Sequence, residues 1–162
     1  MEQSSKTLTF VVPAYNMETY LERCVESLLS ATDNSDIEVL IVDDGSSDST
    51  PELADMYERR WPGNVRAIHQ VNKGHGGAVN TGIANATGMY VKVVDADDWV
   101  DMPSIDTLMG TLRVQRVATD PVDMIVTNYV YDKVGKRVKH TVNFRHAMAT
   151  NTVLGWDDLG CF

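Results

Sequence analysis

The chain has 162 residues, of which 43% are hydrophobic and 23% are charged, and its formal net charge is −9. This length suits a sizeable hydrophobic core, so we expect residues 1–162 to form a single domain. The apolar fraction excludes a disordered chain and a collagen-like repeat. The excess of Asp and Glu over Lys and Arg argues against binding of nucleic acid. It also repels any phosphate ligand unless something neutralises the site.

Two cysteines, Cys24 and Cys161, are too few for a disulfide framework, and neither lies in a zinc-binding pattern. They favour a reducing compartment. The polar residues 1–6 lack the apolar core of a signal peptide, and no run has the roughly 18–20 apolar residues of a membrane span. We therefore expect a soluble, cytoplasmic protein, and peripheral association with the cytoplasmic face of a membrane is compatible with these features.

Short apolar strands and amphipathic helices alternate along the chain. Runs rich in β-branched and aromatic residues predict strands over residues 8–12, 37–42, 65–71 and 89–94. Helical spacing of apolar residues predicts helices over residues 20–29, 50–60 and 76–86, and from Pro103 onward. Thr50 is the expected N-cap of the second helix, and Gly88 the expected end of the third. Cys24 lies in the apolar stripe of the first helix and is expected to be a buried core thiol.

A different pattern follows these units. Residues 123–131 predict a fifth strand, residues 132–136 a hairpin turn, and residues 138–144 a returning strand that alternates apolar and polar side chains. Together the elements predict an α/β fold, namely a Rossmann-like α/β/α sandwich whose parallel central sheet becomes mixed through this antiparallel hairpin. The last residues add no closing element, which indicates the N-terminal part of a longer protein.

In open α/β sheets, ligands bind beyond the carboxyl ends of the strands. Polar or glycine-rich clusters follow all four parallel strands, at residues 13–16, 43–46, 72–77 and 95–98. These clusters are expected to face one crevice.

The fourth cluster carries Asp95 and Asp97. We expect Val93 and Val94 to be buried, so that the two carboxylates emerge at the end of a central strand. Neighbouring carboxylates raise one another's pKa unless a cation holds them ionised, and oxygen-only ligands indicate Mg²⁺ or Mn²⁺. Such an ion would turn a repulsive acidic crevice into a diphosphate site. The alternative is a solvated acidic turn in which Asp101 caps the next helix.

The second and third clusters are compatible with a nucleotide. Asp43 and Asp44 have the carboxylates to accept hydrogen bonds from a base or a ribose, or they form an Asx-type turn instead. The glycines after Asn72 match neither a dinucleotide fingerprint nor a P-loop, and they favour close approach of a ligand to a helix N-terminus. His75 is either a donor to a phosphate or an exposed loop residue. Positive charge is available from Arg66, Lys73 and Lys92, whose placement the sequence leaves open.

In this order and spacing, the segments 11–16, 41–50, 72–82 and 94–98 resemble the family 2 glycosyltransferases of the GT-A type. The resemblance covers roughly residues 7–105. It implies transfer of a sugar from a nucleotide-diphosphate donor, usually UDP-linked, to an acceptor hydroxyl, with metal assistance and in many members with inversion. The implied acceptors are carbohydrates such as polysaccharides, lipid-linked glycans or proteins.

The resemblance also implies roles for individual residues. Pro13, Ala14 and Tyr15 would line the nucleotide pocket with Glu18 nearby, and Asp44 would contact the base. Asp95 and Asp97 would meet the ribose and the divalent metal, with Asp97 as the direct ligand. The remaining candidates for donor binding are Asp43, Asn72, Gly74, His75 and Ala96.

The resemblance is incomplete at the C-terminal side. The catalytic base of the family belongs to an acidic pair well beyond the fourth cluster, and Asp157 and Asp158 are the only candidates in this chain. We therefore expect the acceptor-binding side and the base to be missing. A nucleotide-sugar-binding module without turnover is the alternative. A receiver domain and a nucleotidyltransferase are less compatible, because the first would need a Lys after the fifth strand and the second a glycine-rich loop with an Arg after the first strand.

Overall fold

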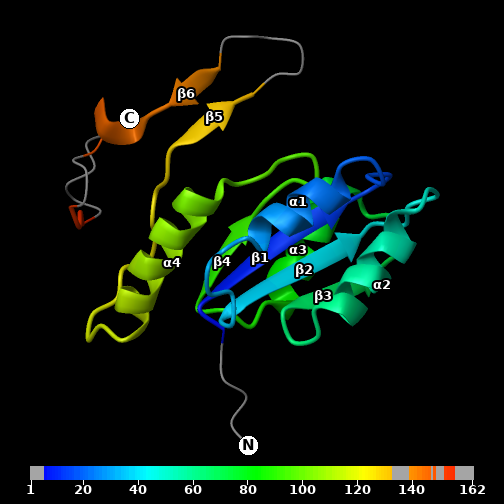
Figure 1. Cartoon of the computed structure of the whole chain (residues 1–162), viewed down its shortest axis with the longest axis horizontal. Helices are drawn as coiled ribbons and strands as arrows, with labels where there is room; N and C mark the ends of the chain where they lie inside the picture. Colours follow the sequence, from blue (N-terminus) through cyan, green and yellow to red (C-terminus); the bar gives the residue numbers. More distant parts are fainter. Residues whose placement is uncertain (1–5, 133–138, 147, 149–151, 156–162) are drawn as a thin grey trace, which may run out of the picture. The chain divides into compact units, whose positions relative to one another are not determined.

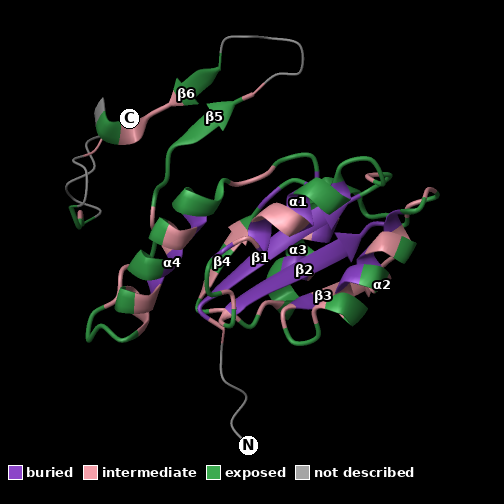
Figure 2. Ribbon diagram, viewed as in Figure 1, coloured by how far each residue is buried: buried purple, intermediate pink, exposed green. Residues whose placement is uncertain are grey.

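A computed structural model describes residues 6–132, 139–146, 148 and 152–155. Its main sheet has four parallel strands in the order β3-β2-β1-β4. The strands are β1 (Leu8–Ala14), β2 (Ile37–Asp43), β3 (Val65–His69) and β4 (Tyr90–Val93). Every residue of β1 and β2 is buried, so these two strands form the centre of the core (Figure 2). The mostly parallel sheet predicted from the sequence is confirmed.

Four helices connect or follow these strands. They are α1 (Leu21–Leu28), α2 (Thr50–Arg60), α3 (Gly74–Asn85) and α4 (Met102–Arg116). Helices α1 and α2 cover one face of the sheet and α3 covers the other, which gives the predicted sandwich (Figure 1). The N-cap of α2 is Ser49 rather than Thr50, and Asp101 caps α4 by accepting a hydrogen bond from the Ser104 N–H. None of the helices in the described part of the chain combines the length and the apolar character that crossing a bilayer requires.

Helix α3 packs closely on β1 because small residues face the sheet. Ala78 is buried with Val11 and Val42, and a Cβ on Gly82 would overlap the Val11 side chain. Gly88, which follows α3, also permits close approach, since a Cβ there would lie 2.6 Å from the Thr9 nitrogen. The helix ends at Asn85 with Ala86 as its C-cap, two residues before Gly88, the expected end.

One prediction about strand position is wrong. Strand β4 pairs only with β1 in the part of the sheet that the structure describes, so Asp95 and Asp97 follow an edge strand instead of a central one. The crossover through α3 carries the chain from β3 to the far side of β1, which places β4 at this edge. As a result Val94 is buried, but the side chain of Val93 is partly exposed.

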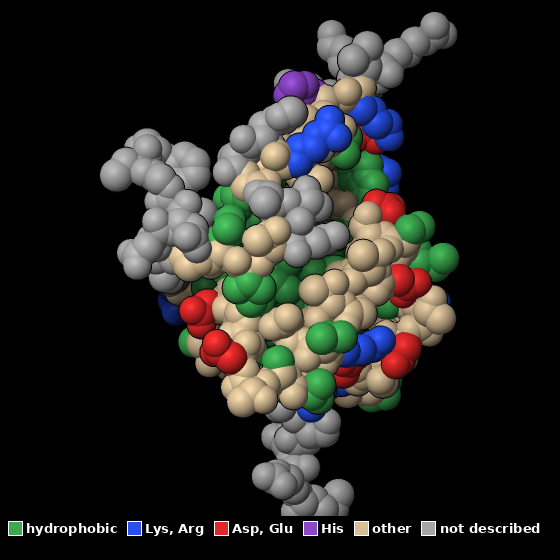
Figure 3. Space-filling model, turned by 90° about the vertical axis from the view of Figure 1, so that its left-hand side faces the viewer, with side chains coloured by type: hydrophobic (Ala, Val, Ile, Leu, Met, Phe, Trp, Pro, Cys, Tyr) green, Lys and Arg blue, Asp and Glu red, His purple; other side chains and the backbone are tan. Residues whose placement is uncertain are grey.

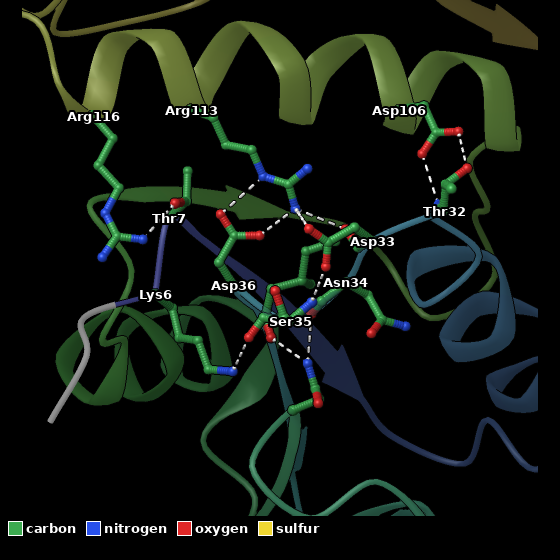
Figure 4. A network of polar contacts seen from close by, with 12 residues as sticks. Lys6, Thr7, Thr32, Asp33, Asn34, Ser35, Asp36, Asp106, Arg113 and Arg116 are labelled. Carbon is green, nitrogen blue, oxygen red and sulfur yellow. Dashed lines mark hydrogen bonds and ion pairs between the residues drawn. The ribbon is translucent and has the colours of Figure 1, made fainter.

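Helix α4 is tied to the amino-terminal edge of the sheet by charged side chains (Figure 4). The Arg113 guanidinium donates to both carboxylate oxygens of Asp36, the residue that precedes β2. Arg116 donates to the Thr7 hydroxyl at 3.0 Å, just before β1. At the other end of the helix, the Asp106 carboxylate accepts hydrogen bonds from the N–H and the hydroxyl of Thr32. These contacts fix the helix that follows the acidic cluster.

The chain divides into two compact units, Met1–Ala118 and Thr119–Phe162. In the second unit, β5 (Tyr129–Tyr131) and β6 (His140–Val142) form a separate antiparallel sheet, followed by the 3₁₀ helix η1 (Phe144–His146). The hairpin therefore does not make the main sheet mixed, and its first strand begins at 129 instead of 123. Most of the predicted turn, residues 133–136, lies outside the described residues. The expectation of one domain over residues 1–162 stays a prediction.

On the face shown in Figure 3, apolar, acidic and basic side chains are interspersed. Isolated apolar side chains are common on protein surfaces. The distribution of charge on this face therefore does not mark a ligand site.

Candidate functional site

A cavity of about 470 Å³ lies at the carboxyl ends of the strands in the first unit. It brings together residues from all four strand-end clusters. Its lining consists of Pro13, Ala14, Tyr15, Met17, Asp44, Asn72, Gly74, His75, Ala78, Asp95, Ala96 and Asp97. Two sequence-predicted site residues, Glu18 and Asp43, are not among them. The cavity therefore joins the segment after β1, a carboxylate after β2, the start of α3 and the acidic segment after β4.

Asp44 contributes a buried carboxylate to this cavity, with 2% of its surface exposed. Its Oδ1 accepts hydrogen bonds from the Gln70 side-chain amide at 2.6 Å and from the Lys73 N–H at 2.8 Å. Burial alone would raise the pKa of Asp44, but these bonds outweigh it and hold the pKa below its ordinary value. The side chain is therefore an ionised acceptor at the cavity wall.

Asp43 is buried, does not line the cavity, and is bound by other residues of the fold. Its carboxylate accepts a hydrogen bond from the Ser46 N–H and lies 3.0 Å from the His69 ring. The other His69 nitrogen lies 3.1 Å from Asp55 on α2. The bond to Asp43, assisted by Asp55, raises the pKa of His69 despite partial burial. His69 was missed in the sequence, although it ends its strand in register with Asp43.

Glu18 anchors the loop that carries Tyr15 into the cavity. Its carboxylate accepts from the Ser49 N–H at 3.0 Å, and its own N–H donates to the Asp48 carboxylate at 3.1 Å. Beside it, Asn16 adopts a positive φ of 55° and accepts from the Ser47 N–H at 2.8 Å. The segment after β1 is thus bound to the segment before α2. Any role of Glu18 toward a ligand stays a prediction.

The acidic segment after β4 contributes two carboxylates to the cavity. The Asp95 Oδ1 lies 2.8 Å from the His75 ring, and both side chains are largely exposed. The Asp98 N–H donates to the Asp95 carbonyl and closes a tight turn. Burial, followed by the charges of Asp97 and Asp95, raises the pKa of Asp98. No Lys or Arg among the described residues forms an ion pair with these three aspartates.

These residues fit a metal ion that is shared with a ligand. Within the described part of the chain, no three metal-binding side chains are arranged to enclose an ion by themselves. Asp95 and Asp97 are two exposed oxygen ligands on one wall of the cavity. Mg²⁺ is commonly held by one or two carboxylates, with phosphate oxygens and water completing its octahedron. The donor set therefore suits Mg²⁺ or Mn²⁺ together with a diphosphate.

Helix α1 supports the acidic segment from beneath. The Cys24 Sγ lies 3.7 Å from the Asp95 carbonyl, the Ser27 hydroxyl accepts from the Val100 N–H, and the Arg23 guanidinium lies 3.3 Å from the centre of the Trp99 ring. Burial, followed by the charges of Asp98, Asp97 and Asp95, raises the pKa of the Cys24 thiol to about 12. The prediction of a buried core thiol at Cys24 is confirmed.

The glycine-rich segment opens α3 toward the cavity. The helix begins at Gly74, two residues earlier than predicted, and Gly74 has a φ of 74°. Its N–H donates to the Asn72 side chain at 3.0 Å, and the N-cap residue Lys73 makes no capping bond with its own side chain. Free N–H groups at the first turn of a helix attract anions.

The three basic candidates have separate positions. Lys73 supplies its backbone N–H to Asp44, whereas Arg66 pairs with Glu38 at 3.1 Å. None of Arg66, Lys73 and Lys92 is among the residues that line the cavity. Asp157 and Asp158, the candidates for a catalytic base, lie outside the described residues.

Comparisons with known proteins agree with this architecture. A family model described as Glycosyl transferase family 2 matches residues 9–157. The chain is 40% identical over 131 residues to glycosyltransferase GlyG of Streptococcus pneumoniae, which covers 80% of the chain and 41% of GlyG. It is 34% identical over 131 residues to the putative glycosyltransferase EpsH of Bacillus subtilis, covering 80% of the chain and 36% of EpsH. The chain thus spans about two fifths of these relatives or less.

Solved structures share the fold. S. aureus TarS 1-349 in complex with UDP-GlcNAc has a TM-score of 0.61 and 26% identity, over 68% of this chain and 32% of TarS. The mannosyltransferase PcManGT from Pyrobaculum calidifontis, in complex with GDP-Man and Mn²⁺, has a TM-score of 0.58 and 26% identity, over 68% of this chain and 33% of PcManGT.

Proposed function

Because the chain belongs to glycosyl transferase family 2, we propose that it binds a nucleotide-diphosphate sugar and takes part in transfer of that sugar to an acceptor hydroxyl. The observation that carries this proposal is the cavity, which combines the buried acceptor Asp44 with Asp95 and Asp97 on another wall. UDP-GlcNAc in TarS and GDP-Man with Mn²⁺ in PcManGT support a donor of this class. Our preferred donor is a UDP-sugar.

In this proposal, each part of the cavity has one task. Asp44 accepts a hydrogen bond from the base, with Pro13, Ala14 and Tyr15 beside it. The first-turn N–H groups of α3 and the His75 ring face the phosphates, where they would stabilise negative charge. Asp95 and Asp97 hold Mn²⁺ or Mg²⁺. When bound, the ion stabilises the leaving diphosphate as a Lewis acid.

For the acceptor, the proposal specifies only the kind of group that reacts, a hydroxyl. A carboxylate base would remove the proton of an acceptor hydroxyl on a carbohydrate, a lipid-linked glycan or a protein, with inversion at the anomeric carbon. Asp157 and Asp158 are the candidates for this base in the chain. We place the reaction in the cytoplasm, including the cytoplasmic face of a membrane, and associate it with polysaccharide synthesis.

Calorimetry tests the donor site. The chain is titrated with UDP and with UDP-GlcNAc, once with Mn²⁺ and once with EDTA. We expect binding that depends on Mn²⁺, because the uncompensated carboxylates repel a diphosphate without a cation. If no nucleotide diphosphate or nucleotide sugar binds under either condition, the proposal is wrong. A donor-consumption assay on the same samples then distinguishes an enzyme from a module that binds without turnover.

A further inference from the structure

The carboxylate of Asp44 is held in one orientation by its neighbours. Its Oδ1 accepts one hydrogen bond from the Gln70 side chain and one from the Lys73 N–H, and the Gly74 N–H also lowers the pKa of this carboxylate. An ionised carboxylate has no proton to donate, so Asp44 is purely an acceptor. Asp44 lines the cavity although only 2% of its surface is exposed, and the bonds from Gln70 and Lys73 do not engage its Oδ2.

The orientation of the Gln70 amide is fixed from behind. The Thr81 hydroxyl on α3 donates to Gln70 Oε1 at 2.6 Å, while Gln70 Nε2 donates to Asp44 at 2.6 Å. The reversed amide would place Oε1 against the carboxylate, where two acceptors repel each other. The Gln70 N–H also donates to the Asp43 carbonyl, which holds its main chain in place. Thr81, Gln70 and Asp44 therefore form a chain of hydrogen bonds with one direction.

We infer that Gln70 and Thr81 are positioning residues that set the base preference of the site. By holding Asp44 as an acceptor, they select a nucleobase with a ring N–H on its Watson–Crick edge. Uracil and guanine carry this N–H, whereas cytosine and adenine present a lone pair at the same place. This inference rests on the proposed function, in which Asp44 meets the base, and it adds that Gln70 and Thr81 hold Asp44 for that contact.

The expected preference for uracil over cytosine follows from the carboxylate of Asp44, which a base without a ring N–H would leave unpaired. A lone pair opposite a buried carboxylate loses a charge-assisted hydrogen bond and adds repulsion. One such bond corresponds to a preference of about 10- to 100-fold for UDP over CDP. Without Thr81, the Gln70 amide is free to rotate, and Asp44 loses part of its fixed orientation. The preference should then fall about threefold to tenfold, within the value of a single hydrogen bond.

The experiment measures the ratio of dissociation constants for UDP and CDP, with GDP and ADP as further arms, all with Mn²⁺. The variants are Thr81→Val, which removes the hydroxyl, and Thr81→Ser, which keeps it. Thr107→Val is the matched control. Thr107 is also a helical threonine whose hydroxyl donates a hydrogen bond, but it is exposed on α4. We expect a reduced ratio only in Thr81→Val and an unchanged ratio in Thr81→Ser and Thr107→Val.

The ratio separates positioning from a general loss of structure. A purely structural defect weakens UDP and CDP equally and leaves the ratio unchanged, which would overturn the role of Thr81. Gln70→Met removes the same link and replaces Thr81→Val if that variant fails to fold. Equal affinity of the unmodified chain for UDP and CDP overturns the inference while the proposed function stands. If no nucleoside diphosphate binds with Mn²⁺, the proposed function fails first. The GDP arm shows which of the two ring N–H bases the cavity admits.

Discussion

The carboxylates at the amino-terminal ends of the parallel strands are paired with basic or hydroxyl groups, whereas those at the carboxyl-terminal ends have no Lys or Arg partner among the described residues. At the amino-terminal ends of the strands, Asp36 is paired with Arg113 (Figure 4). The buried Glu38 is paired there with Arg66 and accepts a hydrogen bond from the Thr9 hydroxyl. At the carboxyl-terminal ends, the His75 ring lies beside Asp95, but no Lys or Arg among the described residues pairs with Asp95, Asp97 or Asp98. The same residue type therefore stabilises the fold at one end of the strands and adds uncompensated charge at the other.

The pKa directions express this difference. Burial would raise the pKa of Asp36, but its bonds to Arg113 and Thr7 lower it overall, and Glu38 behaves in the same way through Thr9, Thr87 and Arg66. The pKa of Asp98 is raised by burial and by Asp97 and Asp95. Unfavourable charge in a folded protein is typical of sites whose ligand supplies the opposite charge. The contrast thus separates structural carboxylates from candidates for ligand binding.

The largest expected effect tests the carboxyl-terminal edge directly. Asp97→Asn should weaken Mn²⁺-dependent UDP binding by about 100-fold or more, since even residues that only support metal ligands are worth about 10- to 100-fold. Its free energy of unfolding should stay equal or rise, because a like charge beside Asp98 is removed. Asp33 lies at the amino-terminal ends of the strands, 3.2 Å from the Arg113 guanidinium, so Asp33→Asn is the control and should leave UDP binding unchanged. Equal binding by Asp97→Asn and the unmodified chain, measured by calorimetry, would contradict the comparison.

The next effect concerns the stability of two helices, α3, which opens at the cavity, and α4, which is bound to the amino-terminal ends of the strands. Gly82→Ala on α3 should lower the free energy of unfolding by about 1–3 kcal/mol, because its Cβ overlaps Val11. Gly110→Ala on α4 should raise it by up to about 1 kcal/mol, since a Cβ there meets nothing within 4 Å and alanine favours the helix. Urea unfolding measures both variants. A neutral Gly82→Ala would show that α3 can move away from β1.

A smaller effect is expected at the amino-terminal edge. Arg113→Ala should destabilise the fold by about 1–2 kcal/mol at pH 7, allowing for partial solvent screening, and leave UDP binding unchanged. Arg60→Ala, which breaks the exposed pair with Glu26, should cost less than about 0.5 kcal/mol. Because the folded pKa of Asp36 is lowered, its contribution exists above the unfolded pKa near 4 and is lost as the pH falls through the folded value. An Arg113→Ala effect that persists undiminished at pH 2–3 would disprove this ion pair as its cause.

The smallest effect has the opposite pH dependence. The pKa of His69 is raised by Asp43 and Asp55, so its stabilisation is present below the unfolded value of about 6.5 and is lost as the pH rises through the folded value. His69→Gln should therefore destabilise the fold more at pH 6 than at pH 9, by less than about 1 kcal/mol because the ring is partly exposed. Thermal unfolding at both pH values measures this difference. An equal loss at both would mean that His69 acts only as a neutral hydrogen-bonding group.

Much of the fold was predictable because its signals are local. Runs of β-branched residues identify β1 and β2, and the rule for parallel strands brings Pro13, Asp44, Gly74 and Asp95 to one edge without knowledge of any contact. The N-cap at Asp101 follows from the same kind of local pattern.

The rest depends on contacts between distant segments. The edge position of β4 is decided by where α3 returns the chain, and the pair between His69 and Asp43 by the register of β2 and β3. Sequence spacing does not determine that Asp43 turns inward while Asp44 lines the cavity. Residues 123–131 predicted a strand, but a strand needs a partner, and among the described residues only 129–131 of this segment are paired.

The buried thiol beneath the acidic segment can serve as a built-in reporter. With a pKa of about 12 and no exposed surface, Cys24 reacts with an alkylating reagent only when the segment above it opens. In a Cys161→Ser variant, the rate at which Cys24 is alkylated therefore measures how often the segment around Asp95 opens and exposes the thiol. The reagent chosen sets the range of opening rates that can be followed. A ligand that bridges Asp95 and Asp97 should lower the alkylation rate of Cys24. The thiol can therefore report whether the cavity is occupied, without any attached probe.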